Sequence, residues 1–350
     1  GSEMCIRDRS DFYLYTDADV NQSGRSVIGT GDDTQKSCYT MANLNRLLNQ
    51  DPELEQKMYD IEYNTRKFIA ENNFRPGNGN GGGNGGGGNG GGGDDGGGTG
   101  GEITPYQDFA GTNTIPVVFH IIYNRSSENI PDSQIQDQIY ALNRDFNANN
   151  GTAIPAVFQN LEADLGVNFE TAGVIRVKSR KKSWRPDDSM KFASSGGSDA
   201  VDPLHYLNVW VVNNMPYMGG NILGYAQFPG GNRATDGIVL DHRFTGNTQY
   251  STGQTATHEI GHWMNLRHIW GDGPCSADDF VSDTPLADGS NTGCPSFPGP
   301  NGCGEDEMFM NYMDYTNDTC MSLFTNGQKA RMAAQFQNGA YRSDMGITIN

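Results

Sequence analysis

The central part of the chain alternates between short hydrophobic runs and polar turns, a pattern that predicts a sheet covered by helices. The run IPVVFHIIY (115–123) is rich in β-branched residues and is expected to be a buried strand. Residues 131–146 place apolar side chains at i, i+4, i+7 and i+11 from Ile135, which predicts an amphipathic helix packed on the sheet. Four further strand candidates follow, at 173–180, 206–212, 221–228 and 236–242.

Capping-box pairs indicate where two later helices begin. Ser251 and Gln254 form one pair, which places the start of a helix at about Thr252. Thr325 and Gln328 form the other, at the start of a final helix that runs to about Gln337. Strands therefore come first, then a helix, then an irregular segment before the last helix. This order predicts an α+β fold with a mixed sheet.

The N-terminal part of the chain has a different organisation. Residues 40–75 predict two helices broken at Asp51–Pro52, because proline does not continue a helix. Residues 77–101 contain 18 glycines in 25 positions, a composition that buries nothing and predicts a flexible linker. We therefore expect a helical block at 10–76, the linker at 77–101 and a main domain at 102–350. Residues 1–9 are interpreted as a non-native or truncated leader.

The charge balance excludes several classes of partner. The net charge is −18, with 24 basic against 42 acidic residues, and no basic stripe is present. Nucleic acid and anionic membrane surfaces are therefore not expected as partners. No run of 18 apolar residues occurs, so no membrane-spanning segment is expected.

The cysteines indicate the compartment. Four of the six, Cys275, Cys294, Cys303 and Cys320, fall in one segment rich in Gly, Pro, Asp and Asn. None forms a C-x-x-C pair, so two disulfides are favoured over a thiolate zinc site, which implies an oxidising compartment. The spacing alone leaves all three possible pairings open.

The stretch TATHEIGHWMNLRHIWGD (255–272) carries the strongest chemical signal. His258 and His262 are one helical turn apart, so both imidazoles face the same way and can bind Zn²⁺. Glu259, beside the first of them, can reach a zinc-bound water without being a ligand. Zinc lowers the pKa of such a water towards about 7, and a carboxylate can take its proton as it attacks a carbonyl.

His268 can be the third ligand only if the helix stops and the chain turns back after about Met264. Such a stop needs a left-handed residue, and asparagine tolerates that conformation best after glycine, so Asn265 suits the turn. The probability of a chance H-E-x-x-H in this chain is roughly 0.4%, which makes an accident negligible. A zinc site that only holds the fold together is the alternative to a catalytic one.

These motifs resemble those of the pappalysin family of metzincin zinc metallopeptidases, in particular its ulilysin-like microbial branch. HEIGHWMNLRHIWGD and NYMDY (311–315) resemble the family's zinc motif and methionine turn. Flanking text such as LNVWVVN, ILGYAQFPGG, VSDTP and FTNGQKARM extends the resemblance over nearly all of 102–340. The departure is Asn265 in place of the usual glycine.

The resemblance implies a metzincin-like catalytic domain and assigns two further residues. Met313 would lie beneath the zinc as an apolar base. Tyr315 would hydrogen-bond the oxyanion of the tetrahedral intermediate. Ordinary core packing is the alternative for each side chain taken alone.

The resemblance also implies the disulfide pairing and a calcium site. It pairs Cys275 with Cys303 and Cys294 with Cys320. It makes CSADDFVSDTP a calcium loop in which oxygens come from Asp278, Asp279, the Ser282 carbonyl and the Thr284 hydroxyl. An ordinary solvated acidic loop is the alternative.

Substrate selection would depend on Asp318 and on an edge strand. Asp318 matches the family aspartate at the floor of the pocket for the residue after the scissile bond, where it would select Arg or Lys. The alternative is a surface carboxylate without a ligand. The strand at 222–228 would bind extended peptide by adding it to the sheet, unless it is an ordinary strand.

The N-terminal block resembles the family's pro-segment, and Cys38 would occupy the fourth zinc position in the latent form. A Cys5–Cys38 disulfide is the competing interpretation. Because no Lys or Arg occurs between Arg75 and Arg125, self-activation would cut at or before Arg75, with Arg66 and Lys67 as other candidates.

The sequence as a whole predicts a secreted zinc endopeptidase made as a latent precursor, with peptides as substrates and its own pro-segment as inhibitor. Two alternatives use the same scaffold. One is a catalytically silent zinc protein for adhesion, although binding alone needs neither Glu259 nor Tyr315. The other is a zinc amidase acting on cell-wall peptides.

Overall fold

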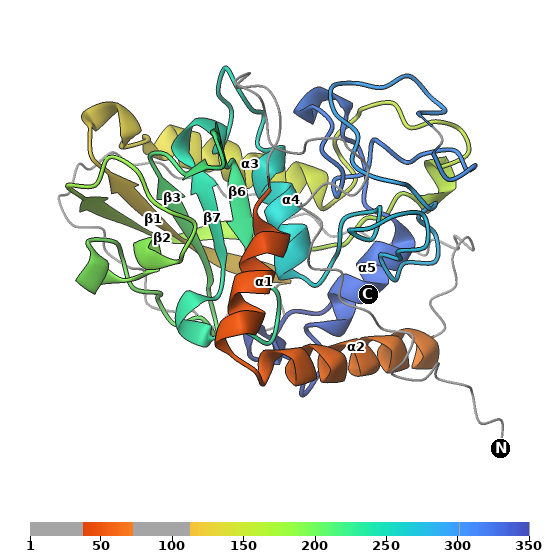
Figure 1. Ribbon diagram of the computed structural model, residues 1–350, viewed down its shortest axis with the longest axis horizontal. Helices are drawn as coiled ribbons and strands as arrows, with labels where there is room; N and C mark the ends of the chain where they lie inside the picture. Colours follow the sequence, from red (N-terminus) through yellow and green to blue (C-terminus); the bar gives the residue numbers. More distant parts are fainter. Residues whose placement is uncertain (1–37, 73–112, 301, 350) are drawn as a thin grey trace, which may run out of the picture.

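The structure is a computed structural model that describes residues 38–72, 113–300 and 302–349. The leader, the glycine-rich linker, Cys5 and the cut expected at Arg75 lie outside these ranges. Figure 1 shows a sheet with helices packed on it and an irregular C-terminal half beside them.

A five-stranded mixed sheet forms the centre of the molecule, as the sequence predicts. Its order is β2-β1-β3-β7-β6, with β6 antiparallel to β7 and the other neighbours parallel. In chain order the strands are β1 (Thr114–Tyr123), β2 (Asn168–Lys178), β3 (Leu207–Val212), β6 (Gly224–Ala226) and β7 (Ile238–Asp241).

The strand expected at 221–228 is interrupted. Its first residue belongs to β5 (Gly220–Asn221), which pairs with β4 (Pro216–Tyr217) in a separate two-stranded ribbon. Only β6, three residues long, joins the main sheet. β6 is nevertheless an edge strand, because β7 is its sole neighbour in the sheet order.

Two helices cover one face of the sheet. The predicted amphipathic helix is α3 (Asp132–Asp145), which packs on β2 and on α4 (Gln254–Trp263). All ten residues of α4 are buried, and the helix contacts β6 and β7. The histidine helix is therefore fixed between α3 and the edge of the sheet.

The start of α4 differs from the prediction. Ser251 does not cap the helix; Gly253 precedes it with a φ of 100°, and the helix begins at Gln254. A side chain at 253 would collide with Ala141 of α3, so the close packing of the two helices, which the capping pattern cannot reveal, decides the start. The Ser251 hydroxyl donates instead to Asp318, at 2.7 Å.

The capping box of the last helix is confirmed. In α5 (Asn326–Ala334) the Thr325 hydroxyl accepts from the Gln328 amide, and the Gln328 side chain accepts from the Thr325 amide. Short 3-10 turns lie at Ser126–Glu128, Gln159–Leu161, Ser189–Lys191, Ala193–Ser195, Arg233–Thr235, His242–Phe244, Asp318–Cys320 and Ser343–Met345. Among the described residues, no helix combines the length and the apolar character needed to cross a bilayer.

Asn265 reverses the chain after α4, as its left-handed tolerance predicts. Its φ is 76°. The Asn265 amide donates to His262 O and the Leu266 amide donates to Gly261 O, both at 2.9 Å. Residues 266–268 therefore turn back along the helix.

The N-terminal block, residues 38–72, consists of α1 (Thr40–Gln50) and α2 (Leu54–Glu71) on either side of Asp51–Pro52. Figure 1 shows α1 crossing beside β6 and α2 running below α5, and both contacts are present. The block is thus docked on the main domain.

A buried ion pair attaches α2. Glu62 accepts from Arg331 of α5 at 2.7 Å and from Arg66 at 2.8 Å. Burial alone would raise the pKa of Glu62, but the charge of Arg331 and the hydrogen bonds from both arginines outweigh it and lower the pKa to about 2. This pair ties the N-terminal block to the helix nearest the C-terminus.

The turn at Asn265 yields a first prediction. Asn265→Gly should change the free energy of unfolding by less than about 0.5 kcal/mol, because glycine adopts the same backbone without strain. Asn265→Val should lower it by about 2 kcal/mol, since a β-branched residue is strained at positive φ. Urea denaturation of both variants checks this, and equal stabilities would show that the turn imposes no such constraint.

The ion pair yields a second prediction. Since the folded-state pKa of Glu62 is depressed from 4.5 to about 2, its stabilisation is fully present above about pH 4.5 and is lost as the pH falls towards 2. Glu62→Gln should therefore lower the free energy of unfolding by about 3 kcal/mol at pH 6, with a smaller difference at pH 3. Urea denaturation at both pH values measures it. Glu55→Gln, at an exposed site on α2, is the matched control, and a difference independent of pH would contradict the assignment.

Candidate active site

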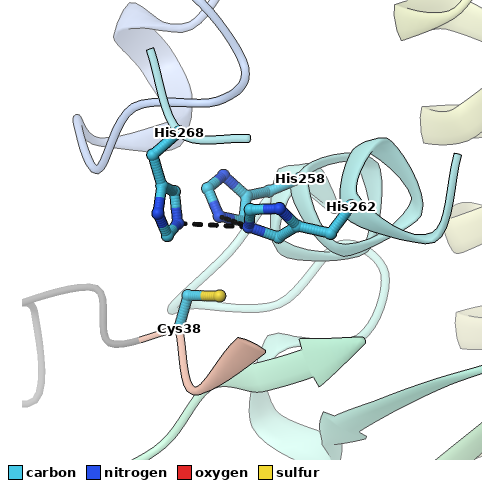
Figure 2. A group of neighbouring side chains, drawn as sticks. All are labelled: Cys38, His258, His262 and His268. Carbon is cyan, nitrogen blue, oxygen red and sulfur yellow. Dashed lines mark hydrogen bonds between the residues drawn. The ribbon is translucent and has the colours of Figure 1, made fainter. Parts of the chain in front are cut away.

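Three histidines converge at the end of α4, as the spacing predicts. His258 and His262 lie on the helix, and the turn after Asn265 brings His268 to them (Figure 2). The Nε2 atom of His262 lies 3.1 Å from Nε2 of His258 and 3.1 Å from Nε2 of His268. All three side chains are buried.

The other ring nitrogen of each histidine fixes its tautomer. Nδ1 of His258 lies 2.7 Å from the Tyr312 carbonyl and Nδ1 of His262 lies 2.8 Å from the Leu266 carbonyl. Nδ1 of His268 contacts the Asp272 carboxylate. Because these oxygens can only accept, each neutral ring carries its proton on Nδ1 and turns an Nε2 lone pair to the centre.

Three lone pairs so close together repel unless a cation lies between them. Tetrahedral zinc with bonds of about 2.0–2.1 Å would place its nitrogen ligands roughly 3.3 Å apart, close to the observed spacing. Burial lowers the pKa of His262 well below its usual value, with the charges of His268 and His258 adding to the effect, which keeps that ring neutral. The donor set therefore fits Zn²⁺.

Cys38 points into the same centre from the N-terminal block (Figure 2). Its Sγ and the three histidine nitrogens all lie within 4.8 Å of one another, the one such group of metal-ligand side chains within the described ranges. The thiol is free and buried, as the latent-form expectation requires. Burial and the nearby Glu259 carboxylate raise its pKa well above the usual value.

Glu259 lies between the centre and the N-terminal block. Its Oε2 accepts from the Thr40 hydroxyl at 2.8 Å and from the Cys38 thiol at 3.4 Å. Burial raises the pKa of Glu259 to about 7, although both hydrogen bonds act in the opposite direction. A carboxylate with this pKa can exchange a proton near neutral pH. Sequence reasoning missed Thr40, which has no motif of its own.

Met313 packs directly against α4. A Cβ at Gly261 would collide with its Sδ, so Met313 fills the space that the glycine inside the H-E-x-x-H motif leaves open. The next residue, Asp314, is fully buried and accepts from the Asn291 amide and from the Tyr315 amide, both at 2.7 Å. Burial raises the pKa of Asp314 to about 7.

Tyr315 lies beside the histidines. Its ring centroid is 5.6 Å from that of His258 and 5.0 Å from that of His268. Trp270 stacks on His268 with centroids 4.3 Å apart. Trp270 and Asp272, two and four residues after His268, were not singled out in the sequence. The signal that could have identified Asp272 is the presence of a carboxylate four residues after the third histidine, within reach of its ring.

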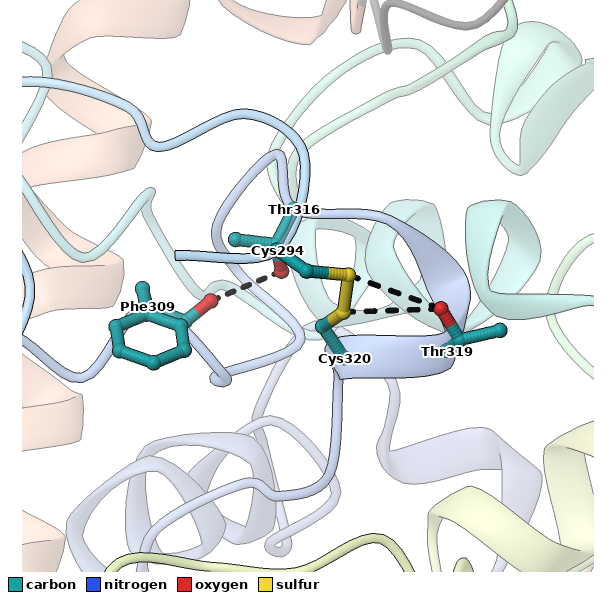
Figure 3. The surroundings of a disulfide bond; sticks show 5 residues. All are labelled: Cys294, Phe309, Thr316, Thr319 and Cys320. Carbon is teal, nitrogen blue, oxygen red and sulfur yellow. Dashed lines mark hydrogen bonds between the residues drawn. A yellow bond between two sulfur atoms is a disulfide. The ribbon is translucent and has the colours of Figure 1, made fainter. Parts of the chain in front are cut away.

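Both expected disulfides are present. Cys275–Cys303 and Cys294–Cys320 have Cα–Cα distances of 5.6 and 5.7 Å. Figure 3 shows the second, with the Thr319 hydroxyl near both sulfur atoms. Because Cys320 ends the 3-10 turn that begins at Asp318, this bond anchors the segment that carries Asp318.

Asp318 lines a pocket of about 270 Å³ at the start of α4, next to Leu223, Thr252 and Thr255. Its carboxylate also holds the segment before α4, accepting from the Ser251 hydroxyl at 2.7 Å and from the Thr252 amide at 2.8 Å. The Asp318 side chain therefore lies in a pocket, where a residue that binds a substrate side chain is expected. It also holds the backbone just before α4 in place.

The expected calcium residues lie in one loop. The Asp279 carboxylate is buried and accepts from the Thr284 hydroxyl at 2.8 Å. Burial raises the pKa of Asp279 well above its usual value, so a cation would offset the cost of its charge. Asp278 and Ser282 are exposed. Asp283, which the sequence left unassigned, accepts from the Thr325 hydroxyl and the Gly327 amide and holds the start of α5.

The N-terminal block occupies the edge strand. Cys38 forms a parallel bridge with Gly224, and the Tyr39 amide donates to the Gly224 carbonyl at 3.1 Å. The Thr40 hydroxyl accepts from the Ala226 amide at 2.8 Å, and the Asn43 side chain donates to the Ala226 carbonyl at 3.1 Å. The hydrogen-bonding edge of β6 is thus covered beside the histidines.

Comparison with known proteins identifies the family. A peptidase family model described as "Pregnancy-associated plasma protein-A" matches residues 194–337. An extracellular metalloprotease of Arthroderma benhamiae is 30% identical over 240 residues, covering 66% of this chain and 80% of the relative. Extracellular metalloprotease 1 of Coccidioides posadasii is 32% identical over 252 residues, with the same coverage. These names confirm the expectation of an extracellular protein.

Two solved structures from Tannerella forsythia extend the comparison. Mature mirolysin in complex with a cleaved peptide is 41% identical, with a TM-score of 0.62, and covers 67% of this chain and 95% of that one. A promirolysin mutant is 34% identical, with a TM-score of 0.69, and covers 89% of this chain and 97% of that one. The likeness to promirolysin thus includes the N-terminal block. The chain belongs to the pappalysin family of metzincin metallopeptidases and is a metalloendopeptidase that carries its own pro-segment.

Proposed function

We propose that this protein is a zymogen whose mature form cleaves peptides with Zn²⁺ held by His258, His262 and His268. The convergence of three Nε2 lone pairs beside Glu259 is the observation that carries the proposal. When bound, zinc supplies Lewis-acid chemistry, acidifying water and polarising the substrate carbonyl. The other tasks fall to side chains of this chain.

Glu259 acts as the general base. Once the N-terminal block has left, its carboxylate loses the Thr40 hydrogen bond and is available to accept the proton of the attacking water. It then returns that proton to the leaving amine. The position of the carboxylate, next to the first histidine on α4 and turned towards Cys38, supports this role.

Tyr315 and Met313 complete the centre. The Tyr315 ring lies against two of the three histidines, from where its hydroxyl can donate to the oxyanion. Met313 packs against α4 in the space left by Gly261, which has no side chain. One residue therefore acts on the reacting atoms, and the other holds the ligand helix in place.

Asp318 selects Arg or Lys after the scissile bond. Its pocket opens beside Leu223, next to the edge strand, so the side chain of a bound peptide can enter it. A guanidinium there would gain charge-assisted hydrogen bonds from the carboxylate. Calcium, bound through Asp278, Asp279, Ser282 and Thr284, would neutralise the buried Asp279 and fix the cysteine-bearing loop.

The pro-segment, within residues 10–76, holds the enzyme latent at three points. Cys38 would hold zinc together with the three histidines, and as a ligand it would be a thiolate. Thr40 hydrogen-bonds the base, and residues 38–43 cover the edge of β6 where substrate would add. Cleavage at or before Arg75, ahead of the linker at 77–101, would free the catalytic domain at 102–350.

A peptide library tests the function. The activated protein, incubated with mixed peptides, should cleave bonds that precede Arg or Lys, as read by mass spectrometry. Glu259→Gln should retain zinc, because Glu259 is not a ligand, while its kcat falls at least about 10³-fold. Cuts without a basic residue after the bond would exclude the Asp318 assignment, and absence of cleavage would exclude the peptidase.

Latency provides a further prediction. Cys38→Ala and Thr40→Val should each shorten the time to self-activation, the second about tenfold, because a hydrogen bond to a charged group is worth about 1.5–3 kcal/mol. Conversion is followed on gels after a trace of mature enzyme is added. Thr40→Ser keeps the hydroxyl and should behave as wild type. Equal rates for the Val and Ser variants would show that Thr40 does not restrain the base.

A further inference from the structure

Arg46 of the pro-segment pairs with a carboxylate that the zinc site does not use. Its guanidinium contacts Asp188, just before the 3-10 turn Ser189–Lys191. The Arg46 side chain is 21% exposed, whereas that of Asp188 is 4% exposed. The pro-segment therefore places a cation over a carboxylate that belongs to the catalytic domain.

The two oxygens of Asp188 have different partners. Oδ1 lies 2.9 Å from Lys191 Nζ and accepts from the Tyr225 hydroxyl at 3.0 Å. Oδ2 contacts the Arg46 guanidinium of the pro-segment. Lys191 is fully buried and donates to the Thr235 carbonyl at 2.7 Å, so it is tied in place. When the pro-segment leaves, Oδ2 loses its cation.

An aromatic surface adjoins this carboxylate. The Tyr39 ring of the pro-segment packs on Tyr217 and Tyr225, with centroids 4.7 and 6.0 Å apart. Tyr39 follows Cys38, the residue bridged to Gly224, and therefore covers this surface directly beside the zinc site. Removing the pro-segment takes Tyr39 away from both rings, and one of them, Tyr225, bonds Asp188 through its hydroxyl. Aromatic rings combined with a carboxylate suit the long apolar stem and charged head of Arg or Lys.

The position along β6 decides which part of a peptide reaches Asp188. The Asp318 pocket includes Leu223, before β6, whereas Asp188 bonds Tyr225 in the middle of the strand. The two carboxylates thus lie towards opposite sides of Gly224, the residue opposite Cys38. If Asp318 receives the residue after the bond, as proposed above, Asp188 faces residues before it.

We propose that Asp188, with Tyr217 and Tyr225, forms a second specificity site that binds a basic side chain upstream of the scissile bond. The Tyr225 hydroxyl bridges the gap between β6 and the carboxylate, so a side chain of arginine length on an added strand spans it. Arg46 occupies the charged end of this site in the zymogen and Tyr39 the aromatic part. The inference rests on the proposed peptidase function.

Peptides of matched charge test the site in the mature enzyme, obtained by activating the full-length protein. Every peptide in the set has Arg directly after the scissile bond. A second Arg occupies a different position before the bond in each peptide, and Gln fills the other positions before the bond. At one upstream position Arg should raise kcat/KM about tenfold over Gln, mainly through KM. Asp188→Asn should reduce this ratio to about one, while Asp187→Asn, the same charge change at the exposed neighbour, should keep it.

The ratio within one enzyme variant is insensitive to how much of that variant folds. If Asp188→Asn does not fold at all, the scan with wild-type enzyme decides, because a preference at no upstream position overturns the inference. A preference that survives in Asp188→Asn also overturns it. Cleavage of no peptide overturns the peptidase function and this inference together, whereas cleavage without upstream preference overturns only the inference.

Discussion

The site depends on the hydrogen bond that each histidine makes at Nδ1. The acceptors come from three places in the chain: Leu266 just after the turn, Asp272 beyond it, and Tyr312 in the distant C-terminal segment. Each acceptor fixes both the orientation of a ring and the nitrogen that carries its proton. Three Nε2 lone pairs are thereby directed at one point, where Zn²⁺ would bind them. The buried helix, the left-handed turn and the methionine beneath the helix all serve to keep these acceptors in position.

The pro-segment engages the same groups that catalysis needs. Within the three residues Cys38, Tyr39 and Thr40, it presents a thiol to the three histidines, a hydroxyl to the proposed base Glu259 and a backbone amide to the edge strand. Farther along, two ion pairs attach it, Arg46 to Asp188 and Glu62 to Arg331. The partner on the catalytic domain, Asp188 or Arg331, is buried in each pair. Loss of the pro-segment partner therefore leaves a poorly solvated charge on the catalytic domain. The pro-segment is thus held both by contacts at the histidine site and by contacts away from it.

The sequence predicts those features that local patterns encode. The H-E-x-x-H spacing, the tolerance of asparagine for positive φ and the Thr325–Gln328 box each act within a few residues, and the structure agrees with all three. The start of α4 was predicted wrongly because Gly253 is placed by contact with Ala141, 112 residues earlier. Thr40, Asp188 and Asp272 carry no motif, because their importance comes from what lies opposite them in space. The strand at 221–228 reads as continuous because hydrophobicity does not reveal which of its residues find a partner.

The contact between Gly261 and Met313 has a consequence for how the metal centre forms. A glycine in mid-helix costs about 1 kcal/mol relative to alanine. Gly261 therefore weakens α4 close to His258 and His262, the two histidines that the helix carries. That weakness is compensated only when the chain returns, some fifty residues later, to place Met313 in the gap and the Tyr312 carbonyl against His258. The three histidines and Glu259 are all present once the growing chain has passed residue 268. The centre is therefore completed by a segment, some fifty residues farther along the chain, that contains none of its three histidines.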